Sequence, residues 1–464
     1  MIVKNSSLSV DTEKLRKKIL DLAMRGKLVP QDSQDEPAST LLEKIKEEKA
    51  QLIKEKKIKK SKPLPEITEE EKPFEIPESW EWVRLGDVLQ SIFAGGDKPK
   101  EFSEVKTDKY AIPVIANGRK SKGVVGYTNS AKVYGEALTI SARGTIGYSV
   151  VRKDPFYPIV RLICIQDTIL NLDFISVAIK DLVIEGTGSS IPQLTVPKLK
   201  TILIPLPPLA EQKRIVAKVE ECMQAIKTIE DSSKEYEKLE NQLDKKVLDL
   251  AMCGKLVPQD SQDEPASTLL EKIKEEKAQL IKEKKIKKSK PLPEITDEEK
   301  PFKIPESWEW VRLGEVTNIV MGQAPKGTLV EENGKGFEFH QGKTHFTDYI
   351  IGSSDKTVSL DNRVIEPRSI VMSVRAPVGD VNIVDRKIYI GRGLSGIKSV
   401  MSDYKYLFYF LSTQKENLNT QATGSTFKAI NGNIVKSIIV PLPPLAEQKR
   451  IVAKIEEIKQ YLEI

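Results

Sequence analysis

Two short segments place serine and arginine beside glycine at matching points of two blocks of the sequence. SARGTIG holds Ser141 and Arg143, and SVRAPVG holds Ser373 and Arg375. Further along, GTGSSIPQL and ATGSTFKAI match again at a Gly-Ser pair. Arginine and serine on exposed turns donate hydrogen bonds to polar or anionic ligands. The simpler interpretation, which the sequence leaves open, is that the glycines only form turns between strands.

No catalytic pattern accompanies these segments. GKGFEFHQGKT resembles a phosphate-binding loop, but five residues separate Gly336 from Gly342 where that loop has four. DPFY, at residues 154–157, differs from the D-P-P-Y tetrapeptide of amino-methyltransferases, and no glycine-rich cofactor loop precedes it. The two histidines, His340 and His345, lack partners at zinc-ligand spacing, so we expect a surface or ligand-facing role for them. The residues predict a binding protein with no catalytic residue, metal site or cofactor of its own.

Composition is typical of a globular protein with much exposed helix. The chain has 464 residues, of which 39% are hydrophobic and 30% charged, and its net charge of +6 permits a nucleic-acid partner without requiring one. It has no apolar stretch long enough to span a membrane, no signal peptide pattern and only three scattered cysteines. We therefore expect a cytoplasmic protein that does not associate with membranes. The lysine-rich stretch at residues 41–62 also contains glutamates, and this mixture predicts a helix with a solvent-exposed charged face.

Internal repeats dominate the organisation of the chain. Residues 20–88 recur as residues 248–316, and the string PLPPLAEQKRIVAK begins at both Pro205 and Pro441. The long repeat differs at four pairs of positions: Arg25 and Cys253, Glu69 and Asp297, Glu75 and Lys303, Asp87 and Glu315. Between the repeats lie two blocks that resemble each other only faintly. Such near-identical flanks around divergent blocks indicate one scaffold that carries two different binding units.

The repeats also predict a long helix with an apolar seam between residues 210 and 250. Its apolar positions follow alternating steps of three and four: Ile215, Val219, Cys222, Ile226, Ile229, Tyr236, Leu243, Val247 and Leu250. The C-terminal segment repeats the first part of this seam, and the N-terminal segment repeats the second part. The simplest arrangement is a circular tandem repeat with pseudo-two-fold symmetry. In it, the central helix runs antiparallel to both terminal helices.

The two blocks read as strands with some helix. Both begin with IPESWEWVRLG, at residues 76–86 and 304–314, and both end at PLPP. We expect the tryptophans of that string to anchor the entrance: Trp80 and Trp82, Trp308 and Trp310. Short β-branched runs such as AIPVIANG, FYPIVRLICIQ and KIYIGRGLSGIKSV are typical of strands, and one helical segment follows in each block. The fold class is therefore α+β: two mixed α/β domains separated by long antiparallel coiled-coil helices.

The order of these segments resembles the specificity (S) subunit of type I restriction-modification enzymes. The resemblance covers the whole chain and rests on the two PLPPLAEQKRIVAK strings, the two IPESWEWVRLG entrances and the pair SARGTIG and SVRAPVG. It implies an N-terminal spacer half (1–75), a first target recognition domain (76–208) and a central spacer (209–303). A second target recognition domain (304–444) and a C-terminal spacer half (445–464) follow. The short final helix departs from the family pattern, because it leaves the seam around Ser233 without an obvious counterpart.

The resemblance also implies the partners. Each block of such a subunit reads one half of a bipartite, asymmetric site in double-stranded DNA. The spacers set the gap between the half-sites and dock methyltransferase (M) subunits, which we expect to number two. Restriction (R) subunits complete the assembly. S-adenosylmethionine is expected in the methyltransferase partner, and none in this chain.

Side chains that read base edges or bind phosphates are expected on loops and strand ends of both blocks. Our candidates are Lys98, Asn117, Arg119, Lys120, Lys122, Arg143, Ser189 and Gln193 in the first block, and Gln323, His340, Gln341, Lys343, His345, Arg375, Arg392, Thr426 and Lys428 in the second. A non-enzymatic coiled-coil scaffold that presents two protein-binding domains fits the spacing equally well. Only the resemblance favours the DNA-reading interpretation.

Overall fold

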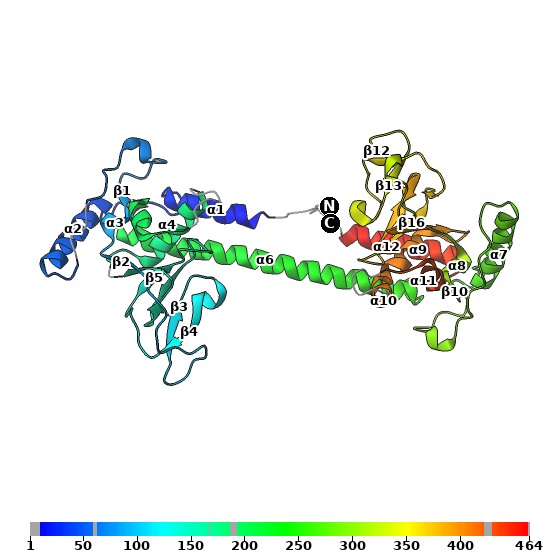
Figure 1. The fold of residues 1–464 in the computed structure, drawn as a ribbon, viewed down its shortest axis with the longest axis horizontal. Helices are drawn as coiled ribbons and strands as arrows, with labels where there is room; N and C mark the ends of the chain where they lie inside the picture. Colours follow the sequence, from blue (N-terminus) through cyan, green and yellow to red (C-terminus); the bar gives the residue numbers. More distant parts are fainter. Residues whose placement is uncertain (1–9, 59–62, 167, 186–192, 422–428, 463–464) are drawn as a thin grey trace. The chain divides into compact units, whose positions relative to one another are not determined.

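The computed structural model describes residues 10–58, 63–166, 168–185, 193–421 and 429–462, and Figure 1 shows its helices and strands. The chain forms two compact units, Ser9–Lys234 and Glu235–Ile464. Their boundary falls inside helix α6 (Leu209–Met252), so each unit contains one block together with parts of both flanking repeats. This division differs from the predicted one, which separates blocks from spacers.

The first unit begins with two helices, continues into the block and ends in the first part of α6. Its elements are α1 (Thr12–Met24), α2 (Ala38–Lys54), η1 (Glu69–Glu71), β1 (Glu81–Arg84), α3 (Leu85–Val88), β2 (Ser91–Ala94), β3 (Ile112–Ile115), η2 (Lys120–Gly123), β4 (Val124–Thr128), β5 (Ala137–Ile140), β6 (Ser149–Arg152), β7 (Tyr157–Pro158), β8 (Ile163–Gln166), α4 (Leu172–Glu185), α5 (Val196–Thr201) and β9 (Leu203–Leu206).

The second unit repeats this order after the end of α6. Its elements are α7 (Ala266–Lys282), η3 (Asp297–Glu299), β10 (Glu309–Arg312), α8 (Leu313–Val316), β11 (Thr317–Met321), η4 (Gly327–Leu329), β12 (Val330–Glu332), β13 (Phe337–His340), η5 (Lys343–His345), β14 (Lys356–Val358), β15 (Val364–Ile365), β16 (Ser369–Ser373), β17 (Val381–Val384), β18 (Ile388–Ile390), β19 (Leu394–Ser399), α9 (Tyr404–Thr413), α10 (Lys415–Gln421), α11 (Gly432–Ser437), β20 (Ile439–Leu442) and α12 (Leu445–Leu462).

The two blocks share a sheet topology that their sequences barely reveal. A four-stranded antiparallel sheet has the order β2-β8-β5-β6 in the first block and β11-β19-β16-β17 in the second. A smaller sheet accompanies each, β4-β3-β7 and β12-β14-β13-β18-β15, and each contains one parallel strand pair. The structure therefore confirms the common frame and the α+β class.

A two-stranded sheet closes the base of each block. In the first block β1, from the IPESWEWVRLG string, pairs with β9 immediately before PLPP, with Trp82 opposite Pro205. In the second block β10 pairs with β20 in the same register, with Trp310 opposite Pro441. Proline is tolerated here because a strand in a two-stranded sheet has one free edge. The repeated strings at entrance and exit thus hydrogen-bond to each other.

Each unit contains an antiparallel helix pair, as predicted. In the first unit Arg16 of α1 binds Glu230 of α6 at 3.0 Å, whereas Gln31, further along the chain, binds Glu211 at 2.6 Å. In the second unit α12 runs antiparallel to the second part of α6, and Lys459 lies 3.2 Å from Asp244. The helices share their cores with the blocks: Ile215 of α6 belongs to the same apolar cluster as the sheet and helix α4.

The apolar seam of α6 is buried only toward its two ends. Ile215 and Ile226 are buried in the first unit, and Val247 is buried in the second. Between them, Ile229 is 39% exposed, Tyr236 57% and Leu243 43%. This exposed midsection is the part of the seam around Ser233 for which the sequence offers no counterpart.

A buried glutamate of the AEQKR string joins each block to its helices. The Trp80 indole Nε1 donates to Glu211 Oε2 at 2.8 Å, and Gln31 Nε2 donates to Glu211 Oε1 at 2.6 Å. In the second unit Trp308 and Gln259 bind Glu447 at 2.9 and 2.6 Å in the same way. Trp80 and Trp308 are each only 3% exposed, which confirms their predicted anchoring role.

The neighbours of this glutamate complete the junction. Gln212 accepts from the backbone N–H of Asn171 at 3.1 Å, at the start of α4, and donates to the Pro207 carbonyl at 3.0 Å. Arg214 forms a two-pronged ion pair with Asp35 at 2.6 and 3.1 Å. The second unit repeats these contacts at Gln448 and Arg450. Contacts within the fold therefore explain why the AEQKR sequence is the same in both units. Three segments distant in sequence must meet there.

Replacing Trp80 with Phe removes one donor to a buried carboxylate, and we expect it to lower the free energy of unfolding by about 2 kcal/mol at pH 7. Burial already raises the pKa of Glu211, and loss of the indole N–H raises it further. A carboxyl whose pKa is higher in the folded state loses stability as pH rises through the interval above its ordinary value of 4.5. The deficit of Trp80→Phe, measured by urea unfolding, should therefore be smaller at pH 5 than at pH 7.

Trp82→Phe is the matched control, because the Trp82 ring packs on Phe74, with centroids 5.0 Å apart, rather than on the carboxylate. Its deficit should not change between the two pH values. An equal loss at both pH values for Trp80→Phe would contradict the assigned role of Glu211.

Candidate nucleic-acid interface

The SARGTIG and SVRAPVG segments form the same turn in both blocks. In the first, Ser141 N donates to Tyr148 O at 2.8 Å, and Gly147 N donates back to Ser141 O at 3.0 Å. In the second, the equivalent bonds are Ser373 N to Asp380 O at 2.8 Å and Gly379 N to Ser373 O at 2.9 Å. The faint sequence match therefore corresponds to a shared turn at the end of β5 and of β16. Arg143 and Arg375 are exposed on it.

A second chain segment crosses each of these turns. Leu194 N donates to Ala142 O at 2.9 Å, and the Arg143 guanidinium donates to Gln193 Oε1 at 2.9 Å. In the second block Ile430 N donates to Val374 O at 3.0 Å. Two candidates from the sequence, Arg143 and Gln193, are thus in direct contact. Ser189, Thr426 and Lys428 lie outside the described residues.

Asn117 fastens three loops of the first block together. Its Oδ1 accepts from Ala142 N at 2.7 Å, and its Nδ2 donates to Val160 O at 2.7 Å. The next residue, Gly118, donates its N–H to Ser141 Oγ at 3.2 Å. Both ends of the Asn117 amide are therefore used within the fold, which makes it a positioning residue.

These bonds bring the basic turn at residues 118–123 beside the SARGTIG turn. Arg119, Lys120 and Lys122 are exposed there, and the Arg119 guanidinium lies 5.7 Å from the Tyr148 ring centroid. Together with Arg143 they form a cationic surface that several loops share. Such a surface can bind a polyanion, because its side chains are positively charged and backbone hydrogen bonds hold the loops that carry them in place.

Backbone strain gathers at the same place. Four non-glycine residues on these loops adopt left-handed conformations: Ser121 (φ 49°), Lys122 (φ 52°), Val160 (φ 54°) and Arg161 (φ 58°). In the described part of the first block no other non-glycine residue has a positive φ. A β-branched residue such as valine strongly disfavours this region, and such strain concentrates at functional sites. Asn117 accounts for part of its persistence, since it holds the Val160 carbonyl.

The equivalent loops of the second block meet at the turn at residues 391–393. Gln323 N donates to Ile390 O at 3.1 Å, Gly393 N donates to Gln341 O at 3.0 Å, and Val374 N donates to Gly393 O at 2.9 Å. A Cβ at Gly393 would lie only 2.5 Å from the Gln341 carbonyl oxygen, so this approach requires glycine. The turn brings together four candidates that are all exposed: Gln323, Gln341, Arg375 and Arg392.

Three further candidates lie around these loops. The Lys98 ammonium lies 3.4 Å from the Phe102 ring centroid in the first block. Lys343 pairs with Asp380, which directly follows the SVRAPVG turn, at 2.7 Å, and His345, two residues after Lys343, is half-buried. Lys98 and Lys343 are exposed despite these contacts.

His340 corrects our expectation of a surface role. Its side chain is completely buried, and burial lowers its pKa to about 4, against the opposing influence of Glu338 at 3.4 Å. The ring meets His345 edge to face, with centroids 5.4 Å apart. A neutral, buried imidazole cannot contact a base edge, so His340 belongs to the packing beneath the site. Period-2 alternation in FEFHQG places His340 on the face opposite Phe337 and Phe339, so the sequence pattern gave no signal of its burial.

Val160 and Arg161 belong to the candidate interface by their position, and our sequence analysis did not select them. Gly95 N donates to Leu162 O at 2.8 Å, and Gly322 N donates to Leu394 O at 2.9 Å, which makes the turns before Leu162 and Leu394 equivalent. The second of these turns contains Arg392, which was predicted. Aligning FYPIVRLICIQ with KIYIGRGLSGIKSV would have revealed its counterpart.

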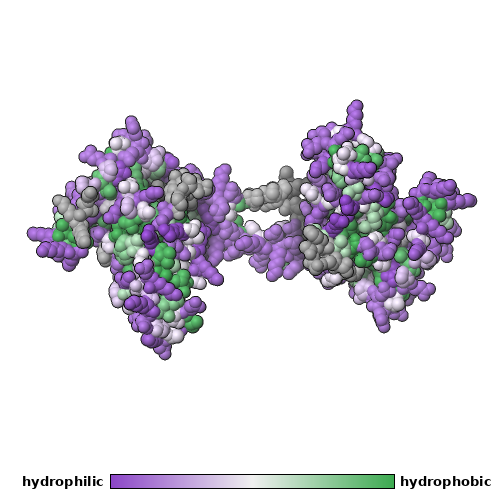
Figure 2. All heavy atoms as spheres, viewed as in Figure 1, coloured by the Kyte–Doolittle hydropathy of each residue, from purple (hydrophilic) through white to green (hydrophobic). Residues whose placement is uncertain are grey.

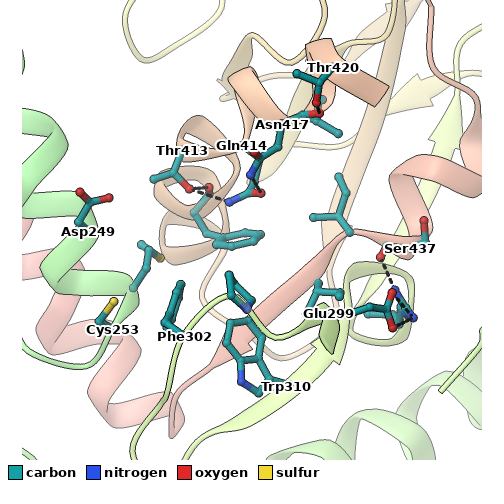
Figure 3. A pocket seen from close by; sticks show the side chains of 17 residues that line it. Asp249, Cys253, Glu299, Phe302, Trp310, Thr413, Gln414, Asn417, Thr420 and Ser437 are labelled. Carbon is teal, nitrogen blue, oxygen red and sulfur yellow. Dashed lines mark hydrogen bonds and ion pairs between the residues drawn. The ribbon is translucent and has the colours of Figure 1, made fainter. Parts of the chain in front are cut away.

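A pocket of about 720 Å³ lies away from these turns, at the junction of the second block with α6 (Figure 3). Asp249, Cys253 and Phe302 line one side of it. In the first unit Arg25 stands where the second has Cys253, and its guanidinium lies 4.4 Å from the Phe74 ring centroid. The described residues contain no cluster of three potential metal ligands, and no described helix is long and apolar enough to cross a bilayer.

Two divergent sets of exposed polar turns on one repeated frame are typical of a modular binding protein. Residues 77–240 and 305–464 match the type I restriction modification DNA specificity domain. The chain therefore belongs to the specificity subunits of type I restriction-modification enzymes, which supply the sequence specificity for DNA.

Individual relatives agree with this assignment. The chain is 33% identical to the EcoAI specificity subunit of Escherichia coli, over 97% of this chain and 89% of that protein. It is 35% identical to the EcoEI specificity subunit of E. coli, over 68% and 63%. A chain solved in work on complex assembly and conformational transition of the type I R-M system superimposes with a TM-score of 0.56 at 26% identity, over 84% of this chain and 92% of that one. HsdS from Thermoanaerobacter tengcongensis shares the fold, with a TM-score of 0.50 at 24% identity, over 84% and 92%.

Asn117→Ala should weaken recognition of one half of the target, because it releases the loops that carry Arg119 and Arg143. It also leaves the Ala142 N–H without its acceptor, so the free energy of unfolding should fall by about 2 kcal/mol. Binding to duplexes altered in one half-site or the other, measured by fluorescence anisotropy, should show lost discrimination in one half only.

Asn171→Ala is the matched control. Asn171 caps α4 by accepting from Phe174 N at 2.8 Å, away from the reading turns, so its loss should lower stability and leave discrimination unchanged. If folded Asn117→Ala discriminates as the wild type does, the proposed arrangement of these loops is wrong.

Proposed function

We propose that the first block reads one half of a bipartite, asymmetric DNA target through the turns around Asn117. The second block reads the other half through the turns around Gly393. The observation that carries this proposal is that equivalent turns, with equivalent backbone bonds, present different side chains in the two blocks. A shared frame with different donors is what two different half-sites require, because base edges are distinguished by donor and acceptor pattern.

Catalysis, in this proposal, belongs to partner subunits. Methyltransferase subunits, two in number, bind S-adenosylmethionine and modify the target, and restriction subunits join the full assembly. The exposed apolar residues Ile229, Leu239 and Leu243 on α6 support docking of helices from such partners, because exposed apolar surface on a helix marks an interaction site. This chain acts by bringing the partners to the sequence that it reads.

Binding to duplexes with and without the target sequence tests this function. The chain together with its methyltransferase subunits should bind the target duplex at least 1,000-fold more tightly than a scrambled duplex at physiological salt. Affinity for both duplexes should fall steeply as salt rises, because phosphate contacts release bound cations. Equal affinity for the two duplexes, or affinity that is insensitive to salt, would favour a protein-binding scaffold instead.

A further inference from the structure

Each unit carries a lysine-rich arm that the reading turns do not explain. We call residues 38–66 and 266–294 the lysine arms, and residues 54–62 and 282–290 their tips. Both tips read KEKKIKKSK, so together they hold twelve lysines and two glutamates. Their combined charge of +10 exceeds the net charge of the whole chain, which is +6, and leaves −4 for all other residues. The net positive charge of this protein is therefore accounted for by these eighteen residues.

In the second unit, hydrogen bonds attach the arm to the block on both sides of the tip. On the outgoing helix α7, the Lys277 ammonium donates to the carbonyls of Gly314, Glu315 and Thr317 at 2.7, 3.1 and 3.1 Å. On the returning segment, Arg312 donates to the Pro293 and Glu294 carbonyls at 3.1 and 3.2 Å. Figure 1 shows α7 beside α8 at the edge of the unit.

The first unit repeats both attachments. Lys49 donates to the Gly86 and Asp87 carbonyls at 3.1 and 2.9 Å, and Arg84 donates to the Pro65 carbonyl at 2.7 Å. Both arms are therefore held against their own block by buried or half-buried cations. In the second unit, the described tip at residues 282–290 lies between the two attachments.

The described tip exposes its lysines to solvent. All six lysines of residues 282–290 are exposed, and within this stretch only Lys285 has a carboxylate partner, Glu283 at 2.8 Å. Hydrophilic side chains surround a small apolar patch on this arm in Figure 2. The tip is thus a cluster of unneutralised positive charge on a fixed support.

At the start of each tip, a lysine adopts the left-handed backbone conformation. Lys284 follows the last turn of α7 with a φ of 59°, and Lys56 has the same φ after α2. This position after a helix normally takes glycine, because other residues pay a steric penalty in the left-handed region. A lysine there in both arms places a positive charge at a position that glycine would occupy with less strain.

The two arms also differ from the two blocks in how similar their sequences are. The two tips are identical, whereas the blocks beside them diverge. A contact that varies with base sequence must differ between half-sites, but the phosphate backbone is the same at any sequence. The Lys277 attachment at Thr317 lies at the start of β11, and Gln323 follows the other end of that five-residue strand, about 17 Å away. The arm base is therefore within about half a helical turn of DNA from the reading turns.

We propose that the tip of the second lysine arm, residues 282–290, binds the phosphate backbone of DNA that flanks the half-site read by the second block, without reading sequence. This inference rests on the proposed function, since it assumes a DNA duplex against the reading turns. It adds a separate, purely electrostatic contact to the base-reading surface. The occupant is a nucleic-acid backbone rather than an acidic protein, because a duplex held against the reading turns presents a continuous row of phosphates close to the base of this arm.

The test is a salt titration of DNA binding by the complex of this chain with its methyltransferase subunits. The variant Lys284→Gln, Lys287→Gln, Lys288→Gln, Lys290→Gln removes four exposed charges from one tip. Each neutralised phosphate contributes about 0.9 to the slope of log affinity against log salt, so the slope should become shallower by about 2 to 4. The change should be equal on target and scrambled duplexes, and the ratio of the two affinities should stay at its wild-type value.

The control variant removes the same charge from lysines that already pair with carboxylates: Lys44→Gln, Lys72→Gln, Lys272→Gln and Lys300→Gln. Its slope should shift by less than 1. Lys284→Gly is a second test variant. It should raise the melting temperature, because glycine relieves the strain after α7, and it should make the salt slope shallower by about 1, because one phosphate contact is lost.

A tip variant with the wild-type slope would overturn the proposal. If that variant instead lost its methyltransferase or restriction subunits in gel filtration at an unchanged slope, the tips would be protein-docking elements. Failure of the proposed function has a different signature, namely a wild-type affinity ratio near one for target and scrambled DNA.

Discussion

A carboxylate buried against an indole N–H is the contact on which the rest of this structure depends. Glu211 is 1% exposed, and so is Glu447, and each accepts from a tryptophan at the entrance of a block and from a glutamine that follows a helix. Removing a charged group from water is unfavourable unless its hydrogen bonds are made, so the contact forms only when all three segments are in place. Burial accordingly raises the pKa of both carboxyls. This geometry couples the helices, the base of the block and the exit strand into one unit, and it occurs twice.

Because the base of each block is fixed in this way, the far ends of its strands are free to vary. The four-stranded sheets keep one order in both blocks, yet the loops that they carry differ in length and side chains. Backbone bonds at the 141–148 and 373–380 turns hold the loops in place without using the exposed arginines. Val160 and Arg161 follow the same principle. The surrounding fold holds their backbone in a strained conformation, and their side chains remain exposed to solvent. A protein built in this way can exchange what it reads without altering how it is assembled.

The repeats made much of the architecture predictable, because a repeated string reports a repeated environment. The antiparallel helix pairs, the tryptophan anchors and the turn shared by SARGTIG and SVRAPVG all followed from spacing. Contacts between distant residues did not. Nothing local marks Asn117 as a residue whose amide joins two other loops, and His340 lies in a polar string although its ring is fully buried. The turn at Val160 and Arg161 could have been found by alignment with the Arg392 turn, but its left-handed conformation could not, because the surrounding fold imposes it.

The most direct test of the account is to map methylated positions in the DNA of cells that contain this chain and its methyltransferase partner, before and after exchange of one block. Residues 76–208 would be replaced by the corresponding block of another specificity subunit, with the two buried glutamates and their partners outside the block retained. The account predicts a two-part target in which one half changes, while the other half and the gap between the halves stay the same. Exchange of residues 304–444 should change the opposite half. Alteration of both halves by a single exchange would contradict the claim that the blocks read DNA independently.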